Sequence, residues 1–269
     1  MTDVPAFPAA ERWAEQLAGW AVPQRVLDQA PADPWTQDPA RFAVGPDDRR
    51  TRSASWAREV LPPVGGTVLD VGCGGGRASL ALVPPATEVV GVDRRGAMLD
   101  EFVAAAARLD VARRTVHGEW PEVASVTPSA DVAVCHHVLY DVADLAPFVL
   151  ALTARARLAV VVEVATIHPM TALAPAWRHF WDLERPSGPG LDDLLAVLRE
   201  LGLDPEWTVS ARAPRAGDAT SPAELAPRVC RRLCLPAERE AEVAEWLADH
   251  PVPWPERMAT LRWPGASEG

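Results

Sequence analysis

A glycine-rich turn that follows an apolar run constrains the fold of this chain more than any other feature of its sequence. The segment VLDVGCGGGR covers residues 68–77, with an acid, Asp70, late in the apolar run and glycines at 72, 74 and 76. Glycine allows the backbone to turn sharply and to approach a ligand without an intervening Cβ. A helical run begins near Ala78. The segment therefore predicts a strand, a ligand-binding turn and a helix in succession.

The alternation of strands and helices continues from residue 67 almost to the end of the chain. Short, largely apolar runs predict strands at 67–71, 88–92, 114–117, 131–135, 158–163, 206–211 and 258–263. The helical spacing of apolar residues predicts helices at 97–109, 145–154 and 191–201. Continuous apolar strands that alternate with helices are typical of a parallel sheet covered on both faces. We therefore expect a doubly wound α/β fold with a seven-stranded, mostly parallel sheet.

Other segments stand outside this pattern. Residues 1–60 predict short helices broken by prolines, and we interpret them as an N-terminal helical cap on an α/β domain at 61–269. That domain carries insertions at about 165–190 and 215–255. The first insertion is rich in proline and aromatic residues, and the second predicts two helical runs separated at Pro236.

The charged residues narrow the class of function. All 26 basic residues are arginine, and the 37 acids give a formal net charge of −11. The absence of lysine excludes a Schiff-base lysine and a Walker lysine. A general nucleic-acid binder needs a cationic surface to displace the counterions of phosphate. We therefore expect no nucleic-acid partner.

The chain also lacks the sequence signals of export and of membrane insertion. The four cysteines (Cys73, Cys135, Cys230 and Cys234) are too few and too scattered to predict a disulfide framework. The N-terminus has no basic start followed by an apolar run, and no stretch of 18 apolar residues occurs. We expect a cytoplasmic protein with no membrane partner and no bound metal, since no ligand spacing resembles a metal site. The oligomeric state is left open.

Two acids at strand ends indicate which ligand the turn binds. A dinucleotide fingerprint places its third glycine where this chain has Arg77, and it presents pyrophosphate to the helix N-terminus. Asp70 would repel a pyrophosphate but suits an ammonium group. Asp93 ends the next predicted strand, 17 residues past Gly76, where a carboxylate can accept hydrogen bonds from a ribose diol. These features favour a positively charged nucleoside ligand over NAD.

The same residues resemble the class I family of S-adenosylmethionine-dependent methyltransferases, from about Ser55 through Trp263. The resemblance implies a Rossmann-like fold whose sheet ends in an antiparallel strand, and S-adenosylmethionine as cofactor. Asp70 would then help to hold the methionine amino group, and Asp93 would bind the ribose. The backbone of the turn would pass beneath the cofactor at three residues, Gly72, Cys73 and Gly74.

Two further motifs extend this resemblance. HGEWPEV at 117–123 would place Glu119 near the adenine amine and Trp120 at the adenine edge or face. DVAVCHHVLYDV at 131–142 would line the methionine portion with Cys135 and His136, and we add Arg94 to the cofactor set because it follows Asp93. The chain departs from the family in the helical segment 221–250, where a short hairpin usually joins the last two strands. This departure leaves the substrate class open.

Candidates for the chemistry follow the fourth predicted strand, at the edge of the sheet where ligands bind in open α/β folds. His137, His136 and Tyr140 stand there. A histidine titrates near neutral pH and can accept the proton of a hydroxyl acceptor. We take His137 as the first choice for a general base. The alternative is that one histidine packs and the other bonds the backbone.

Trp177 and Trp181 in the first insertion are most simply packing residues. The insertion can nevertheless cover the pocket mouth and, with Trp13, Trp20 and Trp35 of the N-terminal segment, form an apolar acceptor chamber. We therefore expect methyl transfer to the O, N or C atom of a small, partly apolar molecule. Three alternatives remain: a cofactor-binding protein without activity that serves as a partner or regulator, a protein or RNA methyltransferase, and an NAD-linked oxidoreductase. Asp70 and Arg77 disfavour the last, and the acidic charge disfavours RNA.

Overall fold

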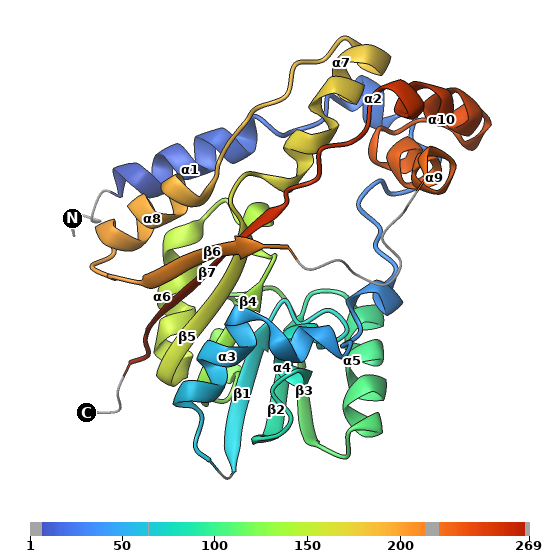
Figure 1. The fold of residues 1–269 in the computed structure, drawn as a ribbon. Helices are drawn as coiled ribbons and strands as arrows, with labels where there is room; N and C mark the ends of the chain where they lie inside the picture. The colour runs from blue at the N-terminus through green and yellow to red at the C-terminus, as the bar shows by residue number, and fades with distance from the viewer. Residues whose placement is uncertain (1–6, 64, 213–220, 267–269) are drawn as a thin grey trace.

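The computed structural model describes residues 7–63, 65–212 and 221–266, and these contain one seven-stranded sheet in the order β3-β2-β1-β4-β5-β7-β6 (Figure 1). The strands are β1 Gly66–Val71, β2 Ala86–Asp93, β3 Ala112–His117, β4 Ala130–His136, β5 Ala156–Ala165, β6 Glu206–Ala211 and β7 Arg257–Pro264. β7 lies between β5 and β6 and runs antiparallel to both, while the other strands share one direction. The predicted fold class is confirmed, including the antiparallel last strand.

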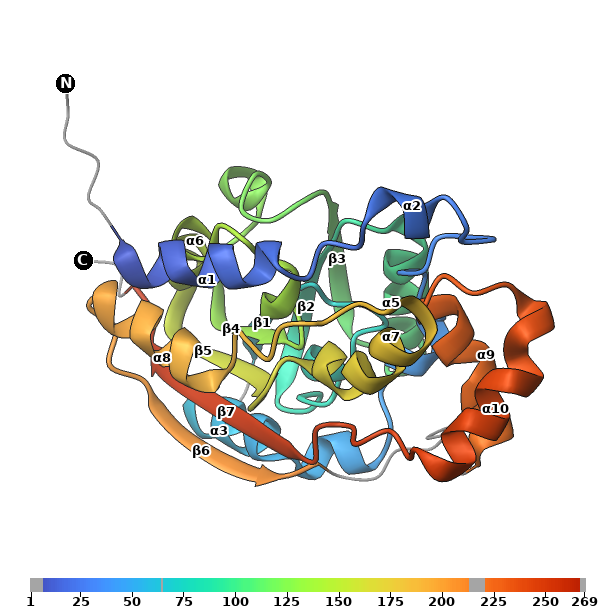
Figure 2. The ribbon, with the colours of Figure 1, turned by 90° about the horizontal axis from the view of Figure 1, so that it is seen from above.

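Each face of the sheet is buried under helices. α1 Pro8–Ala18, α6 Leu145–Arg155 and α8 Leu191–Glu200 cover one face, and α3 Arg52–Val60, α4 Arg77–Leu80 and α5 Gly96–Arg108 cover the other (Figure 2). Successive residues of a strand point to opposite faces, so Leu69 packs under the first set and Val68 under the second. This two-sided burial explains why the strands are continuous apolar runs.

The N-terminal helix α1 is held in place by a carboxylate at its first turn and by a buried tryptophan. The carboxylate of Glu200 accepts hydrogen bonds from the backbone N of Ala9 and Ala10, which satisfies free N–H groups at the first turn of α1. Trp13 is 2% exposed, and its Nε1 donates to the carbonyl of Val142 at 2.8 Å. α1 therefore packs along α8 and α6 as part of the layer that covers the sheet.

A third apolar cluster lies at the end of the molecule toward which the parallel strands point (Figure 1). It joins α2 Gln24–Leu27, α7 Ala174–Trp181, α9 Pro222–Arg232 and α10 Glu240–Asp249. These four helices are called the cap below. Their shared core includes Val26, Trp177, Leu233 and Val243, so segments far apart in the chain stabilise one another. The predicted helical runs on either side of Pro236 correspond to α9 and α10.

The structure adjusts several predicted boundaries. The helix after the glycine turn has only four residues, and α3 packs on β4, β5 and β7. The division at residue 60 stays a prediction. Short 3-10 helices fill the connections: η1 Pro39–Phe42, η2 Asp47–Arg50, η3 Ala124–Val126, η4 Leu139–Asp141, η5 Pro169–Leu173 and η6 Ala237–Arg239. Within the described ranges, no helix has the length and apolar character needed to cross a membrane.

Candidate active site

The glycine turn wraps around the end of β2. The backbone N atoms of Gly72 and Cys73 both donate to the carbonyl of Val92, at 2.8 and 3.0 Å. Gly72 has φ +70° and Gly74 has φ +50°, in the left-handed region that side chains with a Cβ disfavour. A Cβ on Gly72 would also come within 2.3 Å of a methyl carbon of Val138. The turn therefore requires glycine at these positions and exposes backbone to the cavity above it.

Asp93 is held by the turn itself. Its Oδ2 accepts a hydrogen bond from the backbone N of Gly74 at 2.9 Å, and its Oδ1 accepts one from the backbone N of Arg95 at 2.9 Å. Each carboxylate oxygen has a second lone pair, so both remain able to accept from a diol. The side chain of Arg94 lies between two acids, 3.5 Å from Glu119 and 3.9 Å from Asp141. This geometry fits the ribose position that the sequence predicted.

Asp70 lies deeper than Asp93. Only 1% of the residue is exposed, and its Oδ2 accepts hydrogen bonds from the Oγ and the backbone N of Ser79 at 2.7 and 3.2 Å. Burial raises the pKa of this carboxyl to about 6, because the bonds from Ser79 only partly offset the loss of water. A cation in the adjoining cavity would stabilise the ionised form. An ammonium group is such a cation.

A tryptophan forms the wall beside Glu119. Trp120 is 7% exposed, and its Nε1 donates to the carbonyl of Phe148 at 3.1 Å. The two rings pack edge to face with their centroids 6.4 Å apart. The indole is therefore fixed in place at the end of the cavity beyond Asp93, where a flat base could pack against it.

A histidine–glutamate pair stands where β4 and β5 end. His137 adopts φ +60°, its backbone N donates to the carbonyl of Glu163 at 2.8 Å, and its Nε2 lies 3.2 Å from Glu163 Oε1. Glu163 is 8% exposed, and burial by itself would raise its pKa. The contacts with His137, the charge of His136 and the bond from Ser53 instead hold the pKa of Glu163 well below its ordinary value. The carboxylate is therefore ionised and oriented.

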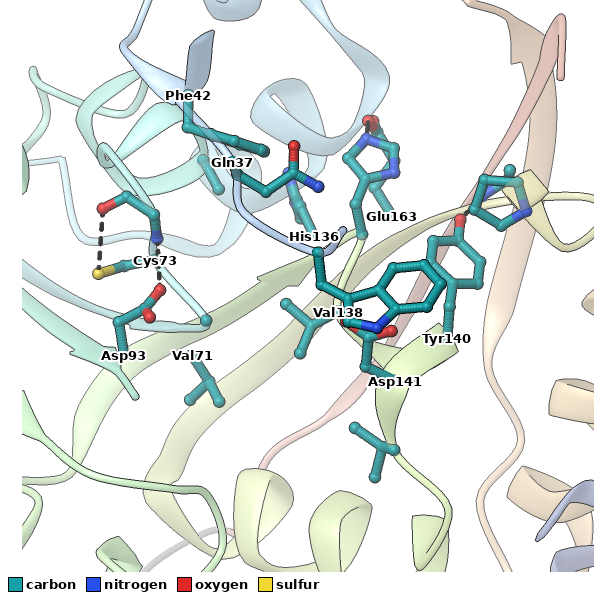
Figure 3. Close-up of a pocket in the computed structure, with 18 of the residues that line it drawn as sticks. Gln37, Phe42, Val71, Cys73, Asp93, His136, Val138, Tyr140, Asp141 and Glu163 are labelled. Carbon is teal, nitrogen blue, oxygen red and sulfur yellow. Dashed lines mark hydrogen bonds and ion pairs between the residues drawn. The ribbon is translucent and has the colours of Figure 1, made fainter. Parts of the chain in front are cut away.

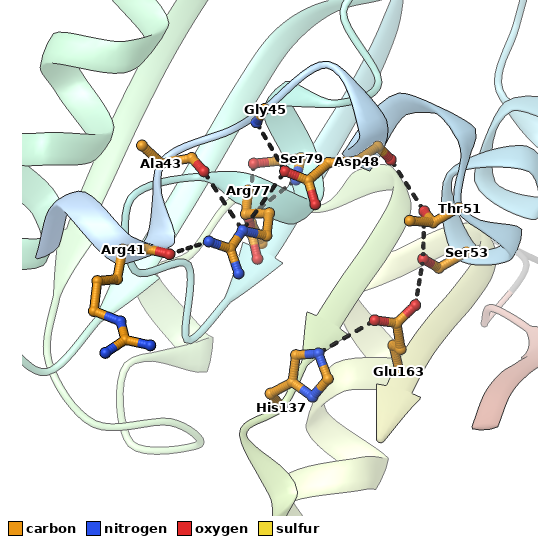
Figure 4. Close-up of polar contacts among 11 residues, drawn as sticks. Arg41, Ala43, Gly45, Asp48, Thr51, Ser53, Arg77, Ser79, His137 and Glu163 are labelled. Carbon is orange, nitrogen blue, oxygen red and sulfur yellow. Dashed lines mark hydrogen bonds and ion pairs between the residues drawn. The ribbon is translucent and has the colours of Figure 1, made fainter. Parts of the chain in front are cut away.

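The pair is the end of a chain of polar contacts (Figure 4). The Oγ of Ser53 donates to Glu163 Oε2 at 3.0 Å and lies 3.1 Å from the Oγ of Thr51. Thr51 in turn donates to the backbone carbonyl of Asp48 at 3.0 Å, and the side chain of Asp48 pairs with Arg77 at 3.6 Å. These polar contacts connect the segment before α3 with the carboxylate at the end of β5.

Tyr140, the remaining candidate for the chemistry, is fixed in position by its neighbours. Its hydroxyl oxygen accepts a hydrogen bond from the backbone N of Ala165, and burial raises the pKa of the phenol above its ordinary value. Its ring packs edge to face with His168, which stacks on Trp20 with centroids 4.2 Å apart. The pKa of His168 is lowered to about 4, mainly by burial, so this histidine is neutral near pH 7. Tyr140 therefore forms part of a wall.

All these groups face one cavity of about 1060 Å³ (Figure 3). Of the residues that the sequence predicted for the site, Cys135 is buried in the core and does not line the cavity. The others line it: Asp70, Gly72, Cys73, Gly74, Asp93, Arg94, Glu119, Trp120, His136, His137 and Tyr140. Their individual roles stay predictions. In Figure 3, His136, Val138 and Glu163 lie between Asp93 and Tyr140. The cavity thus runs from the glycine turn, past the histidines, to the cap.

The structure changes the predicted walls of the chamber. Trp20, Trp35 and Trp177 line the cavity, but Trp13 and Trp181 do not. Trp13 is buried between α1 and the layer over the sheet, and Trp181 packs against the apolar core of the cap. Sequence reasoning missed Glu163, although an acid that ends an apolar strand is the same signal that drew attention to Asp70 and Asp93. It also missed the contribution of α9, which no local pattern predicts.

Cysteine and metal chemistry find little support at this site. Burial raises the pKa of Cys73, which lines the cavity, and of Cys135, which lies in the core behind it, and this disfavours the reactive thiolate. Over the described ranges, no cluster of three or more histidine, cysteine or acid side chains is placed to hold a metal ion.

Comparison with known proteins agrees with this geometry. Residues 68–158 match a family described as a methyltransferase domain, and no curated protein sequence matches the chain. Among solved structures, the chain is similar to the magnesium protoporphyrin IX methyltransferase of Synechocystis PCC 6803, solved with bound S-adenosylhomocysteine, at 15% identity, with a TM-score of 0.52 and 81% of each chain covered.

Two more similar structures have the same fold. One is an S-adenosylmethionine-dependent methyltransferase from Thiobacillus denitrificans in complex with S-adenosylhomocysteine, at 17% identity and a TM-score of 0.50, covering 92% of this chain and 99% of the other. The second is a putative sarcosine dimethylglycine methyltransferase from Galdieria sulphuraria, at 13% identity and a TM-score of 0.53, covering 81% and 84%. Residues 68–158 thus match a methyltransferase-domain family across the glycine turn, and these solved structures share the Rossmann-like fold of the chain.

Proposed function

We propose that this methyltransferase acts on a small, partly apolar molecule bound between the histidine–glutamate pair and the cap. The cavity volume of about 1060 Å³ carries the proposal. Pockets for a single small ligand range over about 300–1,000 Å³, so this cavity has room for a second molecule beside the cofactor. The cofactor takes the end bounded by Gly72, Asp93 and Trp120. The acceptor takes the end bounded by Trp20 and Trp177.

Two observations support a small acceptor over a macromolecule. Two of the similar structures are named for small substrates, magnesium protoporphyrin IX and sarcosine or dimethylglycine. The net charge of −11 also disfavours RNA, which binds to cationic surfaces. All four cysteines are free thiols, which fits the cytoplasmic setting that we include in the proposal.

We assign the role of general base to His137. The bound cofactor supplies an electrophilic methyl group on a sulfonium, so much of the catalysis is the positioning of the acceptor. Because Glu163 is ionised and can only accept, we place the proton of the imidazole on Nε2, 3.2 Å from Glu163 Oε1, which leaves the lone pair of Nδ1 for the acceptor. Nδ1 removes the acceptor proton as the acceptor atom takes the methyl group, and sulfur keeps the electron pair of the broken bond. The products are the methylated acceptor, S-adenosylhomocysteine and a proton.

The test is the acceptor-dependent formation of S-adenosylhomocysteine. The protein is incubated with S-adenosylmethionine and a panel of phenols, alcohols and amines, and the product is quantified by mass spectrometry. His137→Ala should lower turnover of a hydroxyl acceptor by about 10²-fold or more while cofactor affinity is unchanged. His250→Ala is the matched control, because His250 is exposed on the cap and does not line the cavity.

The outcomes separate the remaining alternatives. Turnover that survives in His137→Ala would contradict the general base and leave positioning as the mechanism. Binding of the cofactor without turnover of any panel member would favour a partner or regulatory protein. Turnover only on protein or RNA substrates would contradict the small acceptor.

A further inference from the structure

We infer that the acceptor carries a negative charge, a carboxylate or a phosphate, which Arg185 and Arg232 bind in the outer half of the cavity. The inference rests on the proposal that this half is the acceptor site. It goes beyond that proposal because neither the fold nor a partly apolar lining requires an anion.

The charged lining residues that the chain contributes after Glu163 are all basic, whereas the acids that line the cavity, such as Asp33 and Asp141, come from earlier in the chain. Of the described lining residues that follow Glu163 in the chain, none is a carboxylate and four are arginines, namely Arg185, Arg212, Arg228 and Arg232. The chain as a whole has a net charge of −11. A local excess of guanidinium groups against this background is a specific feature of the cavity wall, and it favours an anionic ligand.

Arg185 has a buried donor for which an anionic ligand would supply the acceptor. Its guanidinium lies over two indoles, 5.3 Å from the ring centroid of Trp20 and 5.1 Å from that of Trp177. Its terminal nitrogens donate to the backbone carbonyls of Trp20 and Ala21, but its Nε is buried without a hydrogen-bond partner. Among the described residues, no acid lies within ion-pair distance of it. A buried N–H donor that lacks an acceptor is costly, and an anion in the cavity would satisfy it.

Arg232 repeats this arrangement on the other side of the chamber, on α9. Its guanidinium lies over Trp35 at 5.4 Å and donates to the carbonyl of Pro34 at 2.9 Å. The pKa of Arg232 is lowered to about 10, mainly by burial and also by the nearby charges of Arg231, Arg228 and Arg95, while Asp141 raises it. Positive charges therefore crowd this part of the wall, and an anion would offset their repulsion.

The stacking also defines the shape of the ligand. Arg228, one helical turn before Arg232, lies over Trp254 at 4.7 Å. A guanidinium that stacks on an indole can still donate in its own plane, and the buried Nε of Arg185 is the donor left for a carboxylate or phosphate. The indoles meanwhile offer flat apolar surface to the rest of the molecule. The fitting acceptor is therefore an apolar, ring-sized body with one anionic group.

Isosteric probes test this inference without knowledge of the natural acceptor. Binding of 2-naphthoate, 2-naphthyl phosphate and the neutral 2-naphthamide to the protein saturated with S-adenosylhomocysteine is measured by calorimetry at constant ionic strength. At least one anion should bind about tenfold more tightly than the amide, since hydrogen bonds to charged groups are the stronger ones. The anion that binds more tightly distinguishes a carboxylate acceptor from a phosphate acceptor.

Variants localise the effect. In Arg185→Gln and Arg232→Gln, the preference for the anion over the amide should fall to about twofold or less. Arg199→Gln removes the same charge from an exposed position on α8 that does not line the cavity, and it should keep the preference. The affinity for S-adenosylhomocysteine and the melting temperature show that each variant is folded.

Equal binding of the amide and the anions to the wild-type protein would overturn the inference. An anion preference that survives in both Arg185→Gln and Arg232→Gln would also overturn it. Methyl transfer confined to neutral acceptors would also overturn it, while leaving the proposed function intact. A clear anion preference without turnover of any acceptor would contradict the proposed function instead.

Discussion

The buried carboxylate of Asp70 makes a quantitative prediction about stability. Its pKa rises from an ordinary value of 3.8 to about 6 in the folded protein. The folded state therefore binds this proton more tightly than the unfolded state, and stability is lost as the pH rises through this range. A shift of about two units corresponds to a destabilisation of about 3 kcal/mol at pH 8 and about 1.5 kcal/mol at pH 5.

The replacement Asp70→Asn isolates this contribution. The amide oxygen can still accept the bonds from Ser79, and any cost of burying the amide NH₂ does not depend on pH. The difference in unfolding free energy between the variant and the wild type should therefore rise by about 1.5 kcal/mol from pH 5 to pH 8, in favour of the variant. Urea unfolding without cofactor, followed by tryptophan fluorescence, measures it. Asp204→Asn, which removes the same charge from an exposed loop, is the control.

A difference that stays flat between pH 5 and pH 8 would refute the reasoning that burial raises the pKa of Asp70. The same variant tests whether the negative charge of Asp70 serves to bind the cofactor. If Asp70 holds the methionine ammonium, Asp70→Asn should weaken S-adenosylmethionine binding by about tenfold or more, and wild-type affinity should fall below about pH 6. Unchanged affinity would assign the carboxylate to another purpose, because the protein would then keep a destabilising charge that the cofactor does not use.

Other expected outcomes follow from the same site. Asp93→Ala should weaken binding of S-adenosylhomocysteine by about 1.5–3 kcal/mol in calorimetry, from lost bonds to a charged group; unchanged affinity would place the ribose elsewhere. Gly74→Val should abolish cofactor binding while circular dichroism stays that of a folded protein, because a β-branched residue resists the φ of +50° at this position; normal binding would show that the turn does not touch the cofactor. Glu163→Gln should lower turnover about tenfold or more at unchanged cofactor affinity; full turnover would show that His137 acts without it.

The sheet could be predicted because its signal is local. β4 and β5 are buried on both faces, so each is a continuous apolar run that needs no partner to be recognised. The same holds for the glycine turn, since glycine is required by backbone angles within the turn itself. The antiparallel direction of β7 came only from the family resemblance, because no local pattern of an apolar strand sets its direction.

The parts that escaped prediction depend on contacts distant in sequence. In the sequence, Arg77 was informative only because it occupies the position of the third glycine of a dinucleotide fingerprint. In the structure, its side chain donates to the backbone carbonyls of Arg41 and Ala43 and pairs with Asp48. It thereby ties the segment before α3 over the glycine turn. Glu163 acquires its role from Ser53, 110 residues away. Neither contact leaves a spacing that a reader of the sequence can detect.

The position of the cap explains why this chain keeps a familiar cofactor turn and yet gives so little sequence indication of its acceptor. The turn and its acids belong to strands whose register is fixed by the sheet, so the cofactor end changes only if the fold changes. The proposed acceptor end is lined by residues of α7 and α9, which belong to the separate apolar core of the cap. Helix α9 lies in the segment between β6 and β7 where the chain departs from the family pattern. Specificity can therefore change there, through residues such as Arg232, without altering the sheet that positions the methyl donor.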